Sequence, residues 1–174
     1  MYPLSIRVAV DVGSTCHRVA AGLPDGKLLD EFDISHNAGS FKEFFHHIER
    51  LEKRHQLPVA VAMEGYNGWA RPLDGQILRH GYRLTSVNNL KLARYKEIFP
   101  APAKTDAIDA RRILELFRLS EHLPLAKNAL HEVAPTPVEN DQLKRTTRRR
   151  KQLVWEQVRV TTGCKATFMR CAQG

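Results

Sequence analysis

The alternation of apolar and polar residues predicts that the chain opens with three β-strands. Short runs rich in β-branched residues mark these strands at residues 6–12 (IRVAVDV), 17–23 (HRVAAGL) and 27–34 (KLLDEFDI). Between the last two lies Pro24-Asp25-Gly26, a hairpin turn in which proline presets φ and glycine accepts a positive φ. We therefore expect an antiparallel meander at the N-terminus.

The period of the pattern then changes, and helices alternate with strands. Apolar residues at helical spacing predict a helix from Ser40, which with Glu43 forms a capping box, to about His55. The run 59–63 (VAVAM) is apolar throughout, which is typical of a strand inside a parallel sheet. Further elements are expected as a helix at 69–80, a strand at 82–87, a helix at 90–98 and a helix capped by Thr105 that runs through Phe117. This order predicts an α/β fold with a mixed five-stranded sheet and helices on both faces.

The pattern lapses between Pro124 and Pro137, which divides the chain. We expect a first domain at residues 1–125, a linker at 126–138 and a long basic helix at 139–160, the start of a coiled-coil region. Residues 161–174 (TTGCKATFMRCAQG) show little helical period and place Gly163 where a helix should continue. We therefore expect this tail to be poorly packed.

Charge changes the picture, because it is unevenly distributed. Residues 1–141 carry 18 basic and 18 acidic residues, whereas residues 142–174 carry nine basic residues and one acidic residue, Glu156. A neutral body with a basic tail predicts that the tail contacts a polyanion. The alternative is a basic helix that is merely solvated.

Composition narrows the class of protein. No apolar run approaches the roughly 20 residues that a membrane span requires. The N-terminus lacks the layout of a secretory signal. Three cysteines, an odd number, stand at Cys16, Cys164 and Cys171, far from any zinc spacing. We expect a protein of the reduced cytoplasm, with no membrane contact.

Four acidic residues are candidates for a metal site. Asp11 and Glu64 end two strands that should be neighbours, and Asp106 and Asp109 lie one turn apart at the start of a late helix. Phosphodiester chemistry suits two divalent ions about 3.5–4 Å apart, which activate the nucleophile and stabilise the leaving oxygen. Hard ions such as Mg²⁺ take carboxylate ligands. Each acid also has an ordinary explanation, as a turn cap, a paired strand end, a first-turn helix acid or a solvated side chain.

The motifs that carry these acids resemble a known family. They are DVGST, MEGYNGWARPL, YRLTSVNNLKLARYK and KTDAIDARRI, in that order. Together, over residues 6 to about 160, they are similar to the N-terminal domain of DEDD-type insertion-sequence transposases, the Piv/MooV group of bridge-RNA-guided recombinases. The resemblance implies a RuvC-like variant of the ribonuclease H fold. It also implies that Asp11, Glu64, Asp106 and Asp109 bind two Mg²⁺ (or Mn²⁺) ions for DNA strand cleavage and exchange.

The same resemblance suggests which residues contact nucleic acid. Tyr66, Asn88, Lys104 and Thr105 match the family pattern and are expected to support the site or to touch DNA or a structured guide RNA. The segment 142–160 corresponds to a helix that in the family packs in an oligomer. Its apolar residues Leu143, Val154 and Val158 form a narrow seam for a homo-oligomer. Six of the eight residues at 144–151 are basic and are expected to face phosphates: Lys144, Arg145, Arg148, Arg149, Arg150 and Lys151.

The chain also departs from that family. Proteins of the family are about twice as long, and their second domain supplies a serine nucleophile that has no counterpart in these 174 residues. When the tail is back-translated and one base is restored near Thr162, the shifted reading frame encodes an amphipathic sequence that continues the family pattern. We therefore interpret 161–174 as an out-of-frame tail of a truncated transposase, and expect little strand transfer from this chain alone.

Three other functions remain open on the sequence. A junction-resolving metal nuclease would use the same four acids with water as the nucleophile. An actin-like or sugar-kinase ATPase would explain DVGST, but it needs a second phosphate loop and an adenosine motif, and neither is found in the sequence. A remnant that only binds nucleic acid, or dimerises through its basic helix, would fit the truncation.

Overall fold

The structure is a computed structural model that describes residues 4–64, 71–98, 106–122, 129–134 and 138–171. Within these ranges, the side chains of residues 71, 106–107, 121–122, 138, 141 and 163–171 are not described. The chain forms two compact units, Met1–Ala134 and Pro135–Gly174.

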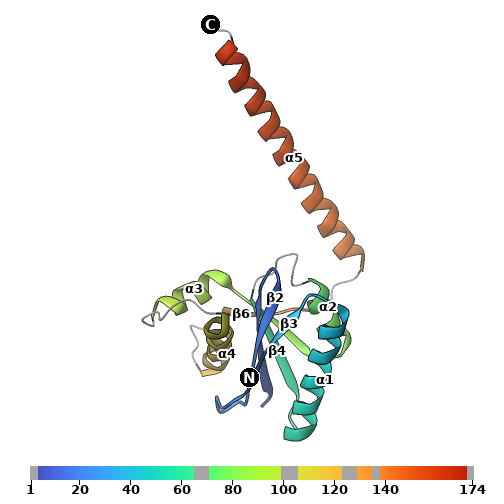
Figure 1. The fold of residues 1–174 in the computed structure, drawn as a ribbon, viewed down its shortest axis with the longest axis vertical. Coiled ribbons are helices and arrows are strands. Elements are labelled where there is room, and N and C mark those ends of the chain that lie inside the picture. Colours follow the sequence, from blue (N-terminus) through green and yellow to red (C-terminus); the bar gives the residue numbers. More distant parts are fainter. Residues whose placement is uncertain (1–3, 65–70, 99–105, 123–128, 135–137, 172–174) are drawn as a thin grey trace. The chain divides into compact units, whose positions relative to one another are not determined.

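A mixed sheet of six strands forms the centre of the first unit (Figure 1). The strands are ordered β3-β2-β1-β4-β5-β6 across the sheet. β1, β4 and β5 are parallel, whereas β2, β3 and β6 are antiparallel to the strands they pair with. The bounds are β1 Ile6–Val12, β2 Cys16–Gly22, β3 Leu28–Ser35, β4 Val59–Glu64, β5 Arg83–Val87 and β6 Leu130–Glu132.

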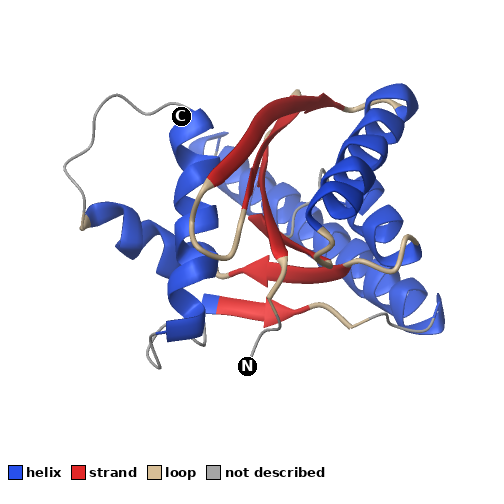
Figure 2. Cartoon of the chain, turned by 90° about the horizontal axis from the view of Figure 1, so that it is seen from below, coloured by secondary structure: helices blue, strands red, loops and turns tan. Residues whose placement is uncertain are grey.

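Helices cover both faces of this sheet, which is visible as red strands between blue helices in Figure 2. α1 and α2 pack on one face, and α3 and α4 pack on the other. A fifth helix, α5, belongs to the second unit. The bounds are α1 Ala38–His55, α2 Arg71–Arg79, α3 Asn89–Glu97, α4 Asp106–His122 and α5 Val138–Cys171.

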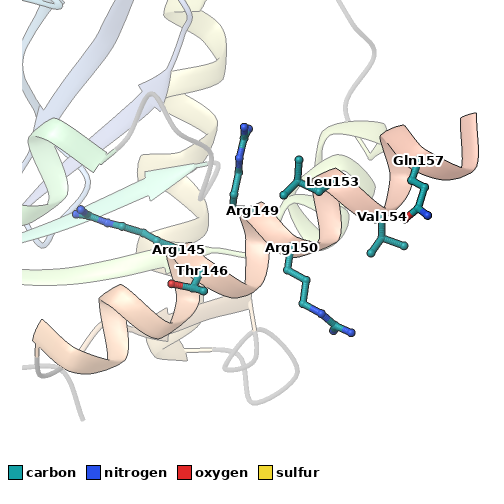
Figure 3. Close-up of a pocket in the computed structure, with 7 residues that line it drawn as sticks. All are labelled: Arg145, Thr146, Arg149, Arg150, Leu153, Val154 and Gln157. Carbon is teal, nitrogen blue, oxygen red and sulfur yellow. The ribbon is translucent and has the colours of Figure 1, made fainter. Parts of the chain in front are cut away.

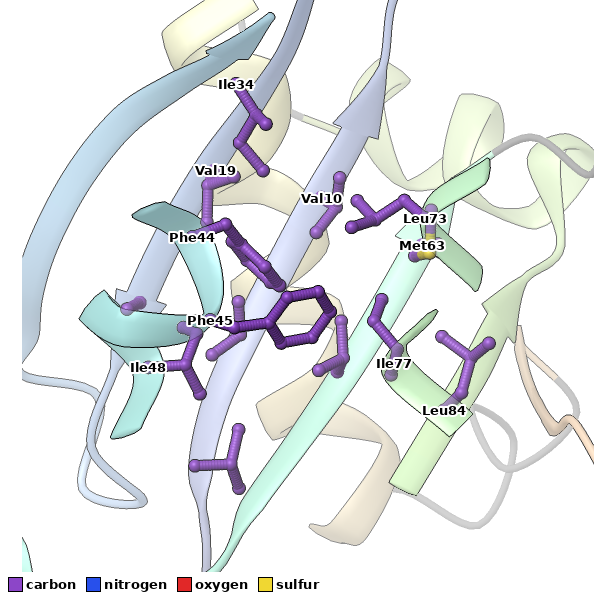
Figure 4. Close-up of a cluster of buried hydrophobic side chains, with 14 of the residues drawn as sticks. Val10, Val19, Ile34, Phe44, Phe45, Ile48, Met63, Leu73, Ile77 and Leu84 are labelled. Carbon is purple, nitrogen blue, oxygen red and sulfur yellow. The ribbon is translucent and has the colours of Figure 1, made fainter. Parts of the chain in front are cut away.

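The face under α1 and α2 holds the larger apolar cluster (Figure 4). Side chains alternate along a strand, so Ile6, Val8 and Val10 of β1 point to this face together. α1 contributes Phe44, which is 1% exposed and packs edge-on against Phe45, with ring centroids 5.0 Å apart. Burial of such large side chains supplies most of the favourable free energy of folding.

The opposite face is lined by small residues. Ala9 of β1, Ala20 of β2 and Ala60 and Ala62 of β4 lie under α4 and are almost fully buried. Side chains this small let the axis of α4 approach the sheet closely. Asp11 comes two residues after Ala9 in β1, and Glu64 comes two residues after Ala62 in β4. The same alternation therefore directs both acids towards the face that α4 covers.

The structure corrects the expected number of strands from five to six. The sixth, β6, lies inside the segment 126–138 that we expected to be a linker, and the first unit extends to Ala134. β6 pairs with β5 through its backbone, and Arg83 Nε and Nη2 donate to Glu132 Oε1 and Oε2 at 3.0 and 2.6 Å. α5 continues to Cys171, so the expected loss of helix after Val160 does not occur.

The start of α1 also differs from the expectation. The helix begins at Ala38, and its N-cap is Asn37, whose Oδ1 accepts a hydrogen bond from the Ser40 N–H at 2.8 Å. Ser40 is therefore the third residue of the helix rather than its cap, and the expected capping box with Glu43 does not form. Asn37 and Ser40 are both good capping residues, and the S-x-x-E spacing indicated the wrong one.

A pair of substitutions tests this assignment. Asn37→Ala should lower the free energy of unfolding by about 1 kcal/mol, because one orphan N–H of the first turn loses its acceptor. Ser40→Ala should change it by less than about 0.5 kcal/mol. Urea unfolding followed by circular dichroism measures both. A larger loss for Ser40→Ala than for Asn37→Ala would contradict the assigned cap.

Candidate active site

Two of the expected acids leave neighbouring strands at one edge of the sheet. Asp11 is the sixth of seven residues in β1, and Glu64 is the last residue of β4. The last paired residues of these parallel strands are Val10 and Met63, so Asp11 and Glu64 occupy the next position on each strand. Both are half-buried. The sheet register therefore gives Asp11 and Glu64 equivalent positions on two neighbouring strands, on the face that α4 covers.

α4 brings a third acid to this face. Asp109, Ala110, Ile113 and Phe117 form the buried stripe of the helix, at the spacing of an amphipathic helix packed on a sheet. The Asp109 side chain is 8% exposed, which is unusual for a carboxylate without partners. Asp106 is the first residue of α4, one turn earlier, and its side chain lies outside the described part.

Lys96 joins two of these acids. Its ammonium Nζ lies 3.1 Å from Asp109 Oδ1 and 3.6 Å from Glu64 Oε2. Arg112 adds a second cation, with its Nη1 3.5 Å from the same Asp109 oxygen. The carboxylates at the end of β4 and near the start of α4 thus converge on one positive charge.

α3, which carries Lys96, is attached to α4 next to the site. Leu92 is fully buried, and the Tyr95 hydroxyl donates to Glu115 Oε2 at 3.2 Å. Burial, together with the negative charge of Glu115, raises the pKa of Tyr95 to about 12, so this hydroxyl remains a donor at neutral pH. Asn88 caps α3, since its Oδ1 accepts from Lys91 N–H at 3.2 Å. Lys96 is consequently presented from a fixed helix.

The chemistry of these groups suits a hard cation. Glu64 Oε2 is buried and accepts no hydrogen bond within the described part of the chain, although the Lys96 ammonium lies 3.6 Å from it. Carboxylate oxygens are the ligands that Mg²⁺ and Mn²⁺ prefer. Among the residues described, we find no group of three acidic, histidine or cysteine side chains that lie close enough to share one ion.

The other expected contacts divide into three groups. Tyr66, Lys104 and Thr105 lie outside the described residues. Asn88 has a structural position as the cap of α3, and its N–H donates to the Ala129 carbonyl at 2.8 Å. Sequence reasoning missed Lys96 and Arg112 as members of the site. Lys96 stood within the motif that carries Asn88, but no local pattern indicates that its side chain reaches Asp109.

The second unit presents the basic residues of α5. Lys144, Arg145 and the residues up to Lys151 are all exposed. Figure 3 shows Arg145, Arg149 and Arg150 extending from this helix, with Leu153 and Val154 one turn further along. Large apolar side chains are also exposed on α5, among them Leu143 (66%), Trp155 (72%) and Val158 (55%). No helix in the described ranges combines the length and the apolar character needed to span a bilayer.

Comparison with solved structures identifies the fold. RuvC from T. thermophilus, solved in complex with a Holliday junction substrate, matches with a TM-score of 0.50 and 12% sequence identity. The match covers 74% of this chain and 99% of that chain. It confirms the expected RuvC-like, ribonuclease H-type fold.

Comparison of sequences identifies the family. No curated protein matches this chain significantly. The sequence model of one family, DEDD_Tnp_IS110, described as transposase, matches residues 8–171. That range contains all four expected acids and most of the segment that we interpreted as out of frame, and it favours the transposase interpretation of DVGST over an ATPase. The chain therefore belongs to the DEDD_Tnp_IS110 family of transposases.

Proposed function

We propose that this chain is the metal-binding catalytic part of a DNA transposase. Asp11, Glu64, Asp106 and Asp109 would hold two divalent ions, Mg²⁺ or Mn²⁺, for phosphodiester cleavage and strand exchange. The observation that carries the proposal is the convergence of Glu64 and Asp109 on one cation, at the edge of the sheet where Asp11 lies near the end of β1. Acids from three separate elements meeting at one edge are hard to explain as ordinary surface charge.

The role of each acid follows from its position in the fold. Asp11 and Glu64 come from the two adjacent strands at the centre of the sheet. Asp109 is buried against that sheet by α4. When bound, the ions lower the pKa of an attacking water or hydroxyl and stabilise the leaving oxygen. The protein's part is to hold its carboxylates at fixed separations and to expose them on one side to the phosphate.

α5 supports a role in nucleic-acid and subunit contacts. Its six basic residues between Lys144 and Lys151 are exposed and suit phosphates of DNA, and of a structured guide RNA. The exposed apolar residues Leu143, Val154 and Val158 suit pairing with a second copy of the helix in a homo-oligomer. These features support action on cellular DNA in the cytoplasm.

A junction-resolving nuclease is the second candidate. It is favoured by the likeness in fold to RuvC, which covers 99% of that chain, and by the fact that RuvC was solved with a Holliday junction. Such a nuclease uses the same acids with water as the nucleophile. Strand transfer, by contrast, would need the serine that the family resemblance assigns to a second domain.

Cleavage of DNA with and without metal tests both candidates. With Mn²⁺, the chain should nick a four-way DNA junction or a duplex, and Asp11→Asn should slow this cleavage at least about 100-fold, because one ligand is lost from the metal site. Asp33→Asn, an exposed residue paired with Arg18, serves as the matched control and should cleave normally. We expect little or no strand transfer by the chain alone.

The outcomes separate the three functions that the family allows. Efficient cleavage of the junction but not of the duplex would favour the resolving nuclease. Robust strand transfer would show that the chain needs no further nucleophile. DNA binding without cleavage under any metal would contradict the catalytic proposal and favour a remnant that only binds nucleic acid.

A further inference from the structure

Lys96 occupies the place in the candidate site where a cation would bridge two acids. Its ammonium lies within 4 Å of both Glu64 Oε2 and Asp109 Oδ1. The side chain is 23% exposed, so the charge is partly removed from water. An ammonium in such a place is retained when it compensates negative charge that would otherwise be buried without a partner.

The two carboxylates depend on Lys96 to different degrees. Asp109 Oδ1 has a second cation, Arg112, at 3.5 Å. For Glu64, Lys96 is the one cation found within ion-pair distance in the described part of the chain, and Glu64 Oε2 accepts no hydrogen bond there. Removing the ammonium would therefore leave Glu64 as a half-buried negative charge facing Asp109. The Lys96 ammonium therefore acts electrostatically as a monovalent substitute for a metal ion.

We propose that the Lys96 ammonium and a divalent ion compete for the position between Glu64 and Asp109. The inference rests on the proposed metal site and adds a regulator to it. Lys96 stabilises the metal-free form by neutralising the acids, and it must withdraw before an ion can bridge them. The geometry permits this, because Lys96 lies in the last turn of α3 and its four-carbon stem reaches solvent. Lys96 is thus a positioning residue that sets the concentration of metal at which the site fills.

Titration calorimetry with Mn²⁺ alone, after chelator treatment, tests the competition. Lys96→Gln should bind Mn²⁺ about tenfold more tightly than the wild type, because a positive charge close to two carboxylates no longer opposes the ion. Lys96→Arg, which keeps the charge, should remain within about threefold of the wild type. Lys91→Gln on the same helix is the matched control, since the Lys91 side chain has no hydrogen bond or ion pair within the described residues, and it should change nothing.

Thermal unfolding in the presence of chelator provides a second readout. Lys96→Gln should lower the melting temperature by about 3–6 °C relative to Lys91→Gln, because Glu64 and Asp109 then repel each other. Adding Glu64→Gln to Lys96→Gln should recover most of this loss, and Mn²⁺ should recover it as well. A role of Lys96 in packing alone would lower stability without raising metal affinity.

The outcomes distinguish the competition from the proposed function. Mn²⁺ binding by the wild type with equal or weaker binding by Lys96→Gln would overturn the competition and leave the metal site intact. Absence of Mn²⁺ binding by the wild type and by every variant would overturn the proposed metal site, and the competition with it. Binding by Lys96→Gln at concentrations that leave the wild type empty would support both.

Discussion

Asp109→Asn should weaken Mn²⁺ binding at least about 100-fold and lower the free energy of unfolding by about 2 kcal/mol in the absence of metal. The loss of affinity follows from the proposed role of Asp109 as a metal ligand, because its buried carboxylate becomes a neutral amide. The loss of stability follows because Lys96 and Arg112, both partly buried, lose the negative charge that they share. Breaking a buried pair costs about 3–5 kcal/mol, and this site is somewhat more exposed.

The two effects are measured separately, by Mn²⁺ calorimetry and by urea unfolding with chelator present. Asp33→Asn again serves as the control, because it removes an exposed aspartate paired with one arginine and should cost less than about 1 kcal/mol. Unchanged metal affinity in Asp109→Asn would remove Asp109 from the site. Unchanged stability would mean that the two cations find other partners, and that Lys96 does not depend on Asp109 for its position.

The sequence predicts the fold well where the pattern of side chains is local. The alternation in IRVAVDV indicates β1, and the apolar run VAVAM indicates a buried parallel strand. In both cases the apolar residues of the strand itself indicate how it is buried. β6 is different: it has three residues, of which only Leu130 is buried. Its existence depends on backbone pairing with β5, which no local pattern reports. The order of elements was therefore predictable, but the sixth strand was not.

The helices show a similar limit at their ends. Asn37 and Ser40 are equally good caps, and only the backbone at Asn37, with φ −137° and ψ 159°, decides between them. The basic helix was expected to end at Val160, yet α5 runs through Gly163 and continues to Cys171. A single glycine costs only about 1 kcal/mol relative to alanine, which a long helix tolerates.

The candidate site could be predicted in part for the same reason. Asp11 and Glu64 follow buried strands, so the rule that parallel strands end at a shared edge places them together from sequence. Lys96 could not be found in this way. It is 13 residues from Asp109 and 32 from Glu64 in the chain, and it reaches them only because Leu92 and Tyr95 fix α3 beside α4. Contacts of this kind are set by packing, which the spacing of residues does not encode.

His17 offers a second prediction with a large expected effect, on the pH dependence of stability. This side chain is fully buried at the start of β2, and its Nε2 has no hydrogen-bond partner among the residues described. His36 Nε2 lies 3.4 Å from its Nδ1. Burial, and secondarily the neighbouring His36, lower the pKa of His17 from 6.5 to about 4. The folded protein therefore keeps His17 neutral at a pH where an unfolded histidine is protonated.

The sign of the effect follows from proton binding. Between pH 6.5 and about 4 the unfolded state takes up a proton at His17 that the folded state does not, so acid stabilises the unfolded state. The wild type should lose about 2 kcal/mol of stability between pH 7 and pH 5 through this one group, at up to about 1.4 kcal/mol per pH unit. The His17→Phe variant has no titrating group at this position. Its loss of stability between pH 7 and pH 5 should therefore be smaller than that of the wild type by about 2 kcal/mol. Urea unfolding at pH 7, 6 and 5 measures the difference.

A comparison of slopes keeps this test independent of packing. Phenylalanine is larger than histidine and will shift the stability of the folded state, but that shift is the same at every pH, whereas the contribution of His17 is not. His46→Gln is the matched control, because it removes a histidine that is exposed on α1. If His17→Phe keeps the slope of the wild type, His17 must take up its proton over the same pH range in the folded and the unfolded state. The space beside Phe41, whose ring centroid lies 6.4 Å from that of His17, would then have to accommodate a charge.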